Sequence, residues 1–529
     1  MIRSNISADN SSTLPLSART SRWLVLSLAT LVLSGCQIGP KYVRPSVPLA
    51  PAYKENQAGS ELAQAEGWKQ ANPQDQVLRG KWWEMFNDPE LNALEEKLNI
   101  DNQNIVQYFQ NYMSARAQVA QARAQLWPTI TVGASGSRSR TPALQSTTTA
   151  SGIATTTTTL QLPVSISWEP DLFGRIRNEI REYSAAAQVS AADLANERLS
   201  EQASLAQYYF ELRGQDALQQ IYDATSNSYR DTLKLTQALF KAGIDSQEDV
   251  ASAETNLRSA EANAVAVATT RAQYEHAIAL LAGQLASTFS IPVKPLSGPP
   301  LAIPTGVASS LLERRPDIAA AERTMAEQNA LIGVGKAAYF PTISLSIGGG
   351  TESATWTNLA NISNRYWSVS PSVSETVFNG GANRAAMRQY RAQYEASVAA
   401  YRETVLNAFK EVEDYLVASR QLAEQTGRQK LAVEASSNNA RLAMIRYKTG
   451  VDPFLNVLTA QNTLFNNQLE LAQLRTQQMT AAVQLIAALG GGWDSSQLPT
   501  DHGRNSKSDS SASAVVPARV QTQTPLSAQ

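Results

Sequence analysis

The sequence contains few of the residues that build metal centres and disulfides, and it has no long apolar run. Its 529 residues include one cysteine and two histidines, so we expect no metal site, and an intrachain disulfide is excluded. We find no apolar run of about 20 residues and therefore predict no transmembrane helix. The 45 basic and 46 acidic residues nearly cancel, which gives no electrostatic reason to expect nucleic acid as a partner. No catalytic motif stands out, so we predict that the protein is not an enzyme and has no cofactor.

The only cysteine lies directly after a signal-like segment. Basic residues precede an apolar run at 23–33, which is too short to cross a bilayer but typical of a signal peptide. The run leads into Leu33-Ser34-Gly35-Cys36, which resembles a lipobox. We therefore predict cleavage before Cys36 and its acylation with S-diacylglycerol and an N-acyl chain such as palmitate. Gln37 follows in place of the aspartate that usually retains such proteins in the inner membrane. The alternative is a free or buried thiol behind an ordinary signal.

The chain contains an internal repeat of about 207 residues, far longer than the periods of solenoid proteins. Four pairs of similar stretches occur in the same order in both halves. They are 126–132 and 339–345, 171–174 and 376–379, 240–245 and 447–452, and 281–283 and 488–490. Each half has the pattern of a helix, two strands, a very long helix, a turn and a further helix. We therefore predict an α+β fold with a two-fold internal repeat.

The longest predicted helices carry narrow apolar stripes. No proline interrupts 379–450, which allows a helix of roughly 100 Å at about 1.5 Å per residue. The stripe residues step by three and four along the chain, as in a coiled coil. In the second half they are Met387, Tyr390, Tyr394, Val398, Tyr401, Val405, Ala408, Val412 and Tyr415, then Leu455, Leu458, Phe465, Leu469, Ala472, Met479, Val483 and Ile486. Helices of this length need neighbours along their whole length.

The predicted strands alternate apolar with small polar residues. This alternation occurs in 129–135, 160–168, 342–348 and 367–373, and it is typical of a barrel with lipid outside and water inside. An ordinary half-buried sheet has the same period. The Thr-rich stretch 147–159 suits a solvated loop. Four strands cannot close and an open edge is not allowed in lipid, so several chains must share one barrel.

Five stretches resemble the TolC-like outer-membrane factors, specifically the NodT-type outer-membrane efflux lipoproteins. They are Trp82–Leu91, Trp168–Arg177, Leu312–Ile318, Lys336–Pro341 and Ala488–Trp493. The resemblance implies a homotrimer in which four strands per chain, 12 in total, form one outer-membrane β-barrel. A long periplasmic α-helical barrel continues it, and an equatorial belt, here including 291–304, surrounds the helices. The implied location is the outer membrane, with a lipid anchor and an extension into the periplasm.

The resemblance also implies the function and the partners. Such a channel passively conducts drugs or toxic small molecules from a periplasmic membrane-fusion adaptor and an inner-membrane pump of the RND or MFS type, and so contributes to multidrug resistance. Two alternatives remain open. The same duct could serve type I protein secretion, or the chain could be a structural coiled-coil lipoprotein without a pore.

The family places its periplasmic gate near the second helix-to-helix turn, often with rings of aspartate. The matching positions here are Asn456 and Thr459, which lack that charge, while Asp249 is a first-half candidate for restoring it. Gly243 and Gly450 lie at the two turns, where glycine tolerates the left-handed backbone that ends a helix. We expect these tips to contact the adaptor, although turn chemistry alone also explains the glycines. Asp452 is predicted to cap the next helix, with Pro453 at its first position.

These patterns divide the chain into six predicted segments. Residues 1–35 are the signal peptide, 36–88 the lipidated segment and equatorial wrap, 89–283 the first repeat, 284–308 a linker, 309–494 the second repeat, and 495–529 a disordered polar tail.

Overall fold

The computed structural model describes residues 38–47, 53–55, 80–142, 154–296 and 311–499. The chain divides into two compact units, and both draw on the two halves of the sequence. One unit contains residues up to 43 together with 116–185 and 325–396, and it includes the sheet. The other contains 44–115, 186–324 and the residues from 397 onward. Among the described residues, no helix combines the length and the apolar character needed to cross a membrane.

The helices confirm the predicted repeat. Helix α5 (Arg175–Lys241) and helix α9 (Ala382–Lys448) each have 67 residues, and their first residues lie 207 positions apart. Helix α6 (Gln247–Leu281) and helix α10 (Phe454–Ala488) each have 35 residues and the same offset. Helix α4 (Gln103–Ala124) and helix α8 (Pro316–Ala337) each have 22. Shorter helices are η1 (Trp82–Phe86), α3 (Pro89–Asp101), α7 (Leu311–Arg314), η4 (Trp356–Asn358), η5 (Ile362–Asn364) and η6 (Ser495–Gln497).

The predicted apolar stripe of α9 is confirmed. Tyr401, Val405, Ala408 and Val412 are fully buried, as expected when residues three and four apart share one helix face. The prediction is wrong at the start of α10, because Leu455 is 64% exposed. Its neighbours Phe454 and Val457 are buried instead, so the inward face at the start of α10 is rotated by about one residue from the predicted stripe. Farther along α10, Ala472, Val483 and Ile486 are buried as predicted.

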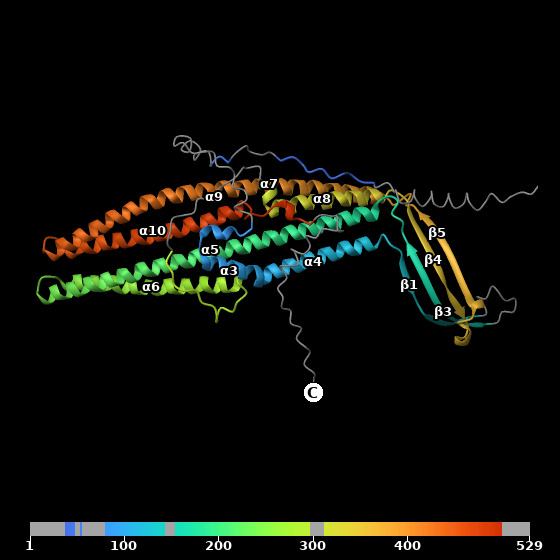
Figure 1. Ribbon diagram of the computed structural model, residues 1–529, viewed down its shortest axis with the longest axis horizontal. Helices are drawn as coiled ribbons and strands as arrows, with labels where there is room; N and C mark the ends of the chain where they lie inside the picture. The colour runs from blue at the N-terminus through green and yellow to red at the C-terminus, as the bar shows by residue number, and fades with distance from the viewer. Residues whose placement is uncertain (1–37, 48–52, 56–79, 143–153, 297–310, 500–529) are drawn as a thin grey trace, which may run out of the picture. The chain divides into compact units, whose positions relative to one another are not determined.

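The sheet follows the predicted alternation, and three of its strands are longer than expected. Its strands are β1 (Thr129–Val132), β2 (Ser135–Thr141), β3 (Thr155–Trp168), β4 (Thr342–Ser353) and β5 (Arg365–Ser374). The order is β1-β3-β4-β5, all neighbours are antiparallel, and β2 also pairs with β3 (Figure 1). The predicted loop at 147–159 is partly wrong, because Thr155–Thr159 belong to β3 and pair with β2.

The first predicted strand is divided into β1 and β2, which gives five strands where four were predicted. Val132 lies opposite Val164 and Ser135 lies opposite Gln161, so β1 and β2 share one register on β3. The gap falls where Gly133 N–H donates to the Pro163 carbonyl at 2.9 Å. Proline has no N–H to return that bond, and the ladder is therefore interrupted at this point.

Pro371 lies opposite Leu345 and does not interrupt β5, which is the last strand of the sheet within one chain. A proline is tolerated there when its nitrogen faces away from the neighbouring strand.

A buried ion network fixes the first part of the predicted belt, Ile291 to Leu296, in the unit that lacks the sheet. Asp216 accepts hydrogen bonds from Arg271 Nε at 2.6 Å, Arg213 Nη1 at 3.2 Å and the Lys294 N–H at 2.9 Å. Arg271 also donates to the Ile291 carbonyl at 2.7 Å. The buried carboxylate accepts from both guanidinium groups and from the backbone of the segment, so this segment is held against α5 and α6. Residues 297–304 of the predicted belt lie outside the described residues.

The predicted tail begins too early. Residues 495–497 form η6, and Asp494 caps that turn by accepting from the Ser496 N–H. Gln188 donates to the Pro499 carbonyl at 2.9 Å, and Leu498 packs beside Ala192. These contacts are available only in the folded chain, which is why composition alone assigned the segment to the tail. Residues 500–529 lie outside the described residues.

Candidate functional site

One face of the sheet exposes large apolar side chains. The register places Ile130 opposite Ile166, Ile166 opposite Ile347, and Ile347 opposite Val369, so one apolar row crosses all four neighbouring strands. The exposed residues of this face are Ile130, Val132, Leu162, Val164, Trp367, Val369 and Val373. A contiguous exposed apolar surface of this kind marks contact with lipid or with another protein.

The opposite face of the sheet carries small hydroxyl residues. Thr131 and Ser165 share a hydrogen bond of 2.6 Å between their side-chain oxygens, and Ser344 and Ser372 share one of 2.7 Å. Both pairs lie directly across neighbouring strands. The sheet therefore has one face suited to an apolar phase and one suited to water, as the alternation predicted.

The junction between β3 and α5 contains one of the stretches that carried the family resemblance. Asp171 accepts from both the backbone N–H and Nε of Arg177, at 2.9 and 3.1 Å. Arg175 pairs with Glu169 and Glu179 at 3.1 and 2.6 Å. These ion pairs begin α5 immediately after the strand, so the charged residues of this motif have a structural role.

The chain that follows the predicted lipidation site packs against this junction. The Ile38 N–H donates to the Phe173 carbonyl at 3.3 Å, and Asn178 Nδ2 donates to the Ile38 carbonyl at 2.9 Å. A Cβ on Gly333 would lie 2.6 Å from the Asn178 side chain, so only glycine permits this approach. Cys36 itself lies outside the described residues, and its acylation remains a prediction.

Both helix-to-helix turns end their first helix in the same way. Gly243 and Gly450 each have a φ of 75°, which confirms the predicted left-handed backbone. The N–H groups of Ile244 and Val451, the residues after the two glycines, each donate at 2.9 Å to a carbonyl of the preceding helix. This is the bonding of a Schellman motif, and it turns the chain into α6 and α10.

The four helices of this region pack around one apolar cluster, and α6 lies beside α5 as α10 lies beside α9 (Figure 1). The cluster consists of Tyr229, Leu233, Ala253, Leu257, Ala260, Ala440, Ala443, Tyr447, Phe454, Val457 and Ala460. Its many alanines allow close approach of the helices, so the two turns are held side by side at the tip.

The two turns use their equivalent aspartates differently. Asp452 forms a two-point ion pair with Arg446, with distances of 2.7 and 3.0 Å, and the hydrogen bond from Arg446 lowers the pKa of Asp452. Asp245 instead accepts a hydrogen bond from the Tyr447 hydroxyl, which comes from the other half of the chain. Burial and this bond raise the pKa of Tyr447. The aspartate of each turn therefore has a partner.

The predicted capping role of Asp452 is wrong. Pro453 occupies the N-cap position of α10, and its side chain cannot form a capping hydrogen bond. The Asp452 carboxylate is bound to Arg446. A complete capping box occurs in the first half. There the Asp249 N–H donates to Ser246 Oγ at 3.1 Å, and the Ser246 N–H donates to Asp249 Oδ2 at 3.2 Å. Asp249 thus has a structural role at the start of α6.

The proposed gate residues lie near the tip and are exposed. Asn456 and Thr459 belong to the first turns of α10, and Thr459 Oγ1 donates back to the Leu455 carbonyl at 2.9 Å. Asn456 occupies the repeat position of Asp249, 207 residues later. Sequence reasoning missed Arg446 and Tyr447, whose partners become clear only when the helices are placed together.

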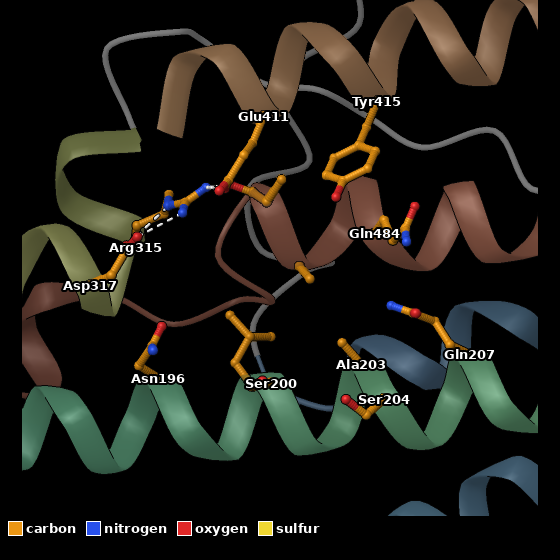
Figure 2. Close-up of a pocket in the computed structure, with 13 residues that line it drawn as sticks. Asn196, Ser200, Ala203, Ser204, Gln207, Arg315, Asp317, Glu411, Tyr415 and Gln484 are labelled. Carbon is orange, nitrogen blue, oxygen red and sulfur yellow. Dashed lines mark hydrogen bonds and ion pairs between the residues drawn. The ribbon is translucent and has the colours of Figure 1, made fainter. Parts of the chain in front are cut away.

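A polar cleft lies in the unit that lacks the sheet, between α5, α9, α10 and the start of α8 (Figure 2). Arg315 pairs there with Asp317 at 2.7 Å and with Glu411 at 2.8 Å, and donates to the Ala488 carbonyl at 3.0 Å. Two carboxylates neutralise this guanidinium, and its bonds hold α8 to the other helices. Asn196, Ser200, Ser204, Gln207 and Gln484 also line the cleft. Among the residues that the structure describes, no group of acidic, histidine or cysteine side chains could hold a metal ion.

Comparison with known proteins identifies the family. The model of the outer membrane efflux protein family matches residues 96–284 and 307–491. This chain belongs to the outer membrane efflux protein family. A toluene efflux pump outer membrane protein of Pseudomonas putida, TtgC, is 32% identical over 482 residues, which cover 90% of this chain and 96% of the relative. An antibiotic efflux pump outer membrane protein of Pseudomonas putida, ArpC, is similar to the same extent.

A solved structure shows the same fold. The outer-membrane channel OprN superimposes with a TM-score of 0.79 at 29% identity, covering 87% of this chain and all of that channel. The structural relatives are trimeric TolC-like outer-membrane channels, as predicted. This chain is thus an outer-membrane component of an efflux pump, a passive channel and not an enzyme. It is placed in the outer membrane with an extension into the periplasm, and its family implies a trimer that assembles with an adaptor and an inner-membrane pump.

Proposed function

We propose that the protein is the exit duct for small apolar toxic compounds, such as solvents and hydrophobic antibiotics, in a pump driven by an RND or MFS transporter. The observation that carries the proposal is the sheet with one exposed apolar face and one hydroxyl face. The apolar face lies against the lipid of the outer membrane, and the hydroxyl face lines the water-filled exit. Relatives named for toluene and antibiotic efflux support this choice of substrates.

The helix tips provide the periplasmic entrance and contact a membrane-fusion adaptor. Gly243 and Gly450 keep the two turns compact, and the Arg446–Asp452 pair closes the second turn. With Asn456 and Thr459 at the gate, closure relies on hydrogen bonds and packing, because these side chains are uncharged. Such a gate differs from an aspartate ring in having no strong field for cations.

The lipid on Cys36 serves sorting and additional anchoring. The lipid chains anchor only the N-terminal end of each protomer, whereas the apolar face of the sheet itself contacts lipid, so insertion does not depend on the anchor. We therefore expect Cys36→Ala to retain part of its activity if an alternative cleavage lets it reach the outer membrane. An unprocessed, inactive variant would show instead that acylation is required.

The function is tested by deleting the gene and measuring the minimal inhibitory concentrations of toluene, hydrophobic antibiotics and hydrophilic control compounds. We expect sensitivity to the apolar compounds, restored by the wild-type chain. If efflux were unchanged and the secretion of one large protein were lost, a role in type I secretion would replace the proposal.

A second measurement separates the duct from a structural lipoprotein. The purified trimer is reconstituted in planar bilayers, with and without the Asp452→Asn substitution that removes the ion pair closing the second turn. We expect conductance that rises in the variant. A trimer that never conducts in either form would support a structural role without a pore.

A further inference from the structure

Three arginines lie at the far end of the apolar face of the sheet. Arg138 and Arg140 follow Gly136 at alternate positions of β2, and Gly136 lies opposite the apolar Leu160. Arg365 precedes Trp367 by two positions on β5. Because residues two apart in a strand share a face, all three arginines lie on the face that exposes the apolar side chains. All three are exposed.

The stagger of the strands brings these arginines to the same edge of the apolar face. At the end that joins the helices, Thr342–Ser344 of β4 extend past Trp168, the last residue of β3. At the far end, Thr155–Thr159 of β3 extend past Ser353, the last residue of β4. At both ends, β3 is therefore displaced away from the helices relative to β4, as in a sheet of tilted strands. Arg365, the first residue of β5, therefore lies at the same edge of the apolar face as Arg138 and Arg140. We call this edge the arginine border.

The border carries positive charge without acidic residues on its own face. Glu352 is the one acidic residue in the five described strands, and it pairs across the sheet with Gln161 on the opposite face. Among the described residues, none of the three arginines has an ion-pair partner. Trp367, 81% exposed, lies between Arg365 and the apolar row, which is the usual place of an aromatic residue at a lipid-water interface.

We propose that Arg138, Arg140 and Arg365 bind the phosphates of lipopolysaccharide in the outer leaflet. The inference rests on the proposed contact of the apolar face with lipid. The other end of the strands joins α4, α5, α8 and α9, so the arginine border is the end away from the periplasm. A guanidinium binds phosphate through paired hydrogen bonds. Lipid A has two phosphates on one disaccharide, and it therefore suits a row of arginines better than a phospholipid with one phosphate.

The test measures lipid binding to the full-length trimer by native mass spectrometry. The probes are lipid A with both phosphates, lipid A without phosphates, and phosphatidylglycerol. The test variant carries Arg138→Gln, Arg140→Gln and Arg365→Gln. The control removes three positive charges from exposed positions of α9, with Lys410→Gln, Arg428→Gln and Arg441→Gln. A basic residue near an anionic membrane surface contributes about fivefold in affinity, so we expect the test variant to bind lipid A at least about tenfold more weakly and the control to bind like wild type.

The proposal is overturned if the test variant keeps wild-type affinity for lipid A, or if the control loses as much. It is also overturned if phosphatidylglycerol or dephosphorylated lipid A binds wild type as tightly as lipid A does. Conductance in planar bilayers is measured in parallel, because it depends on the channel and not on these arginines. A wild-type trimer that conducts while its lipid A affinity is insensitive to the arginines refutes only this inference. A trimer that fails to conduct both as wild type and with Asp452→Asn refutes the proposed function instead.

Discussion

Glu95 lies in α3 with none of its surface exposed, and neither of its carboxylate oxygens has a hydrogen-bond partner among the described residues. Burial raises its pKa well above the ordinary value of 4.5. The folded protein therefore holds a proton that the unfolded chain releases once the pH exceeds about 4.5. Because the pKa of this carboxyl is raised in the folded state, the bound proton makes the folded state more stable at low pH than at neutral pH. The stability falls as the pH rises from the unfolded pKa toward the folded one.

The magnitude follows from linkage. Each pH unit over which only the folded state keeps the proton costs about 1.4 kcal/mol of stability. Glu95→Gln has nearly the same shape and no charge, so this loss should disappear. We expect variant and wild type to differ little in their pH response below about pH 4.5. Above pH 4.5, the free energy of unfolding of the variant should rise relative to that of the wild type. The rise is up to about 1.4 kcal/mol per pH unit, until the carboxyl of the folded wild type itself ionises.

The assay is hydrogen exchange of the α3 amides, Pro89–Asp101, in the intact trimer between pH 5 and pH 8. Opening free energies are corrected for the intrinsic exchange rate at each pH. Glu96→Gln is the matched control, because this neighbouring glutamate is exposed and pairs with Lys81. The reasoning is refuted if the difference between wild type and Glu95→Gln is the same at both ends of the pH range.

Three further predictions concern the turns, the belt and the gate. Gly450→Ala places a side chain on a left-handed backbone and should lower the free energy of unfolding by about 1 kcal/mol, measured by thermal unfolding. The control Gly427→Ala lies in open space within a helix and should raise it by about 0.5 kcal/mol. Equal effects of the two substitutions would contradict the strain argument. Asp216→Asn removes the charge shared by Arg213 and Arg271, which keep Glu90 and Glu275 as partners, and should cost about 1 to 3 kcal/mol. Increased proteolysis near Ile291 is the readout, and an unchanged cleavage pattern would show that this network does not hold the belt. Changing Asn456 and Thr459 together to Asp should make the conductance more sensitive to divalent cations, and an unchanged sensitivity would show that these positions do not form the gate.

The described part of the fold was largely predictable because its elements follow local periods. A helix of 67 residues and its repeat 207 positions later can be found from spacing alone, since apolar residues recur every three or four positions. The alternation of the strands similarly assigned each residue to a face. Only the register shows that Pro163 lies opposite Gly133 and that the first predicted strand is divided there.

The partners of the charged residues could not be predicted in this way. Asp452 was expected to cap α10 and binds Arg446 instead, although both possible partners are near in sequence. Which one a carboxylate binds depends on the path of the turn, because a hydrogen bond forms only within about 3 Å and in the right direction. The predicted start of the tail at 495 was wrong for the same reason, since Pro499 is held by Gln188, 311 positions away.

The sequence by itself determined the doubled strand-and-helix plan, the two faces of the sheet and the family. These properties are carried by residue periods and by short motifs, and each is readable within one segment of chain. Tertiary structure decided which turn aspartate binds Arg446 and which binds Tyr447, how the belt is fixed on Asp216, and where three arginines meet the edge of the apolar face. Several of these contacts join residues far apart in the chain, as Tyr447 and Asp245 are by 202 positions. Their free energy depends on burial and geometry that exist only after the helices and strands have packed together.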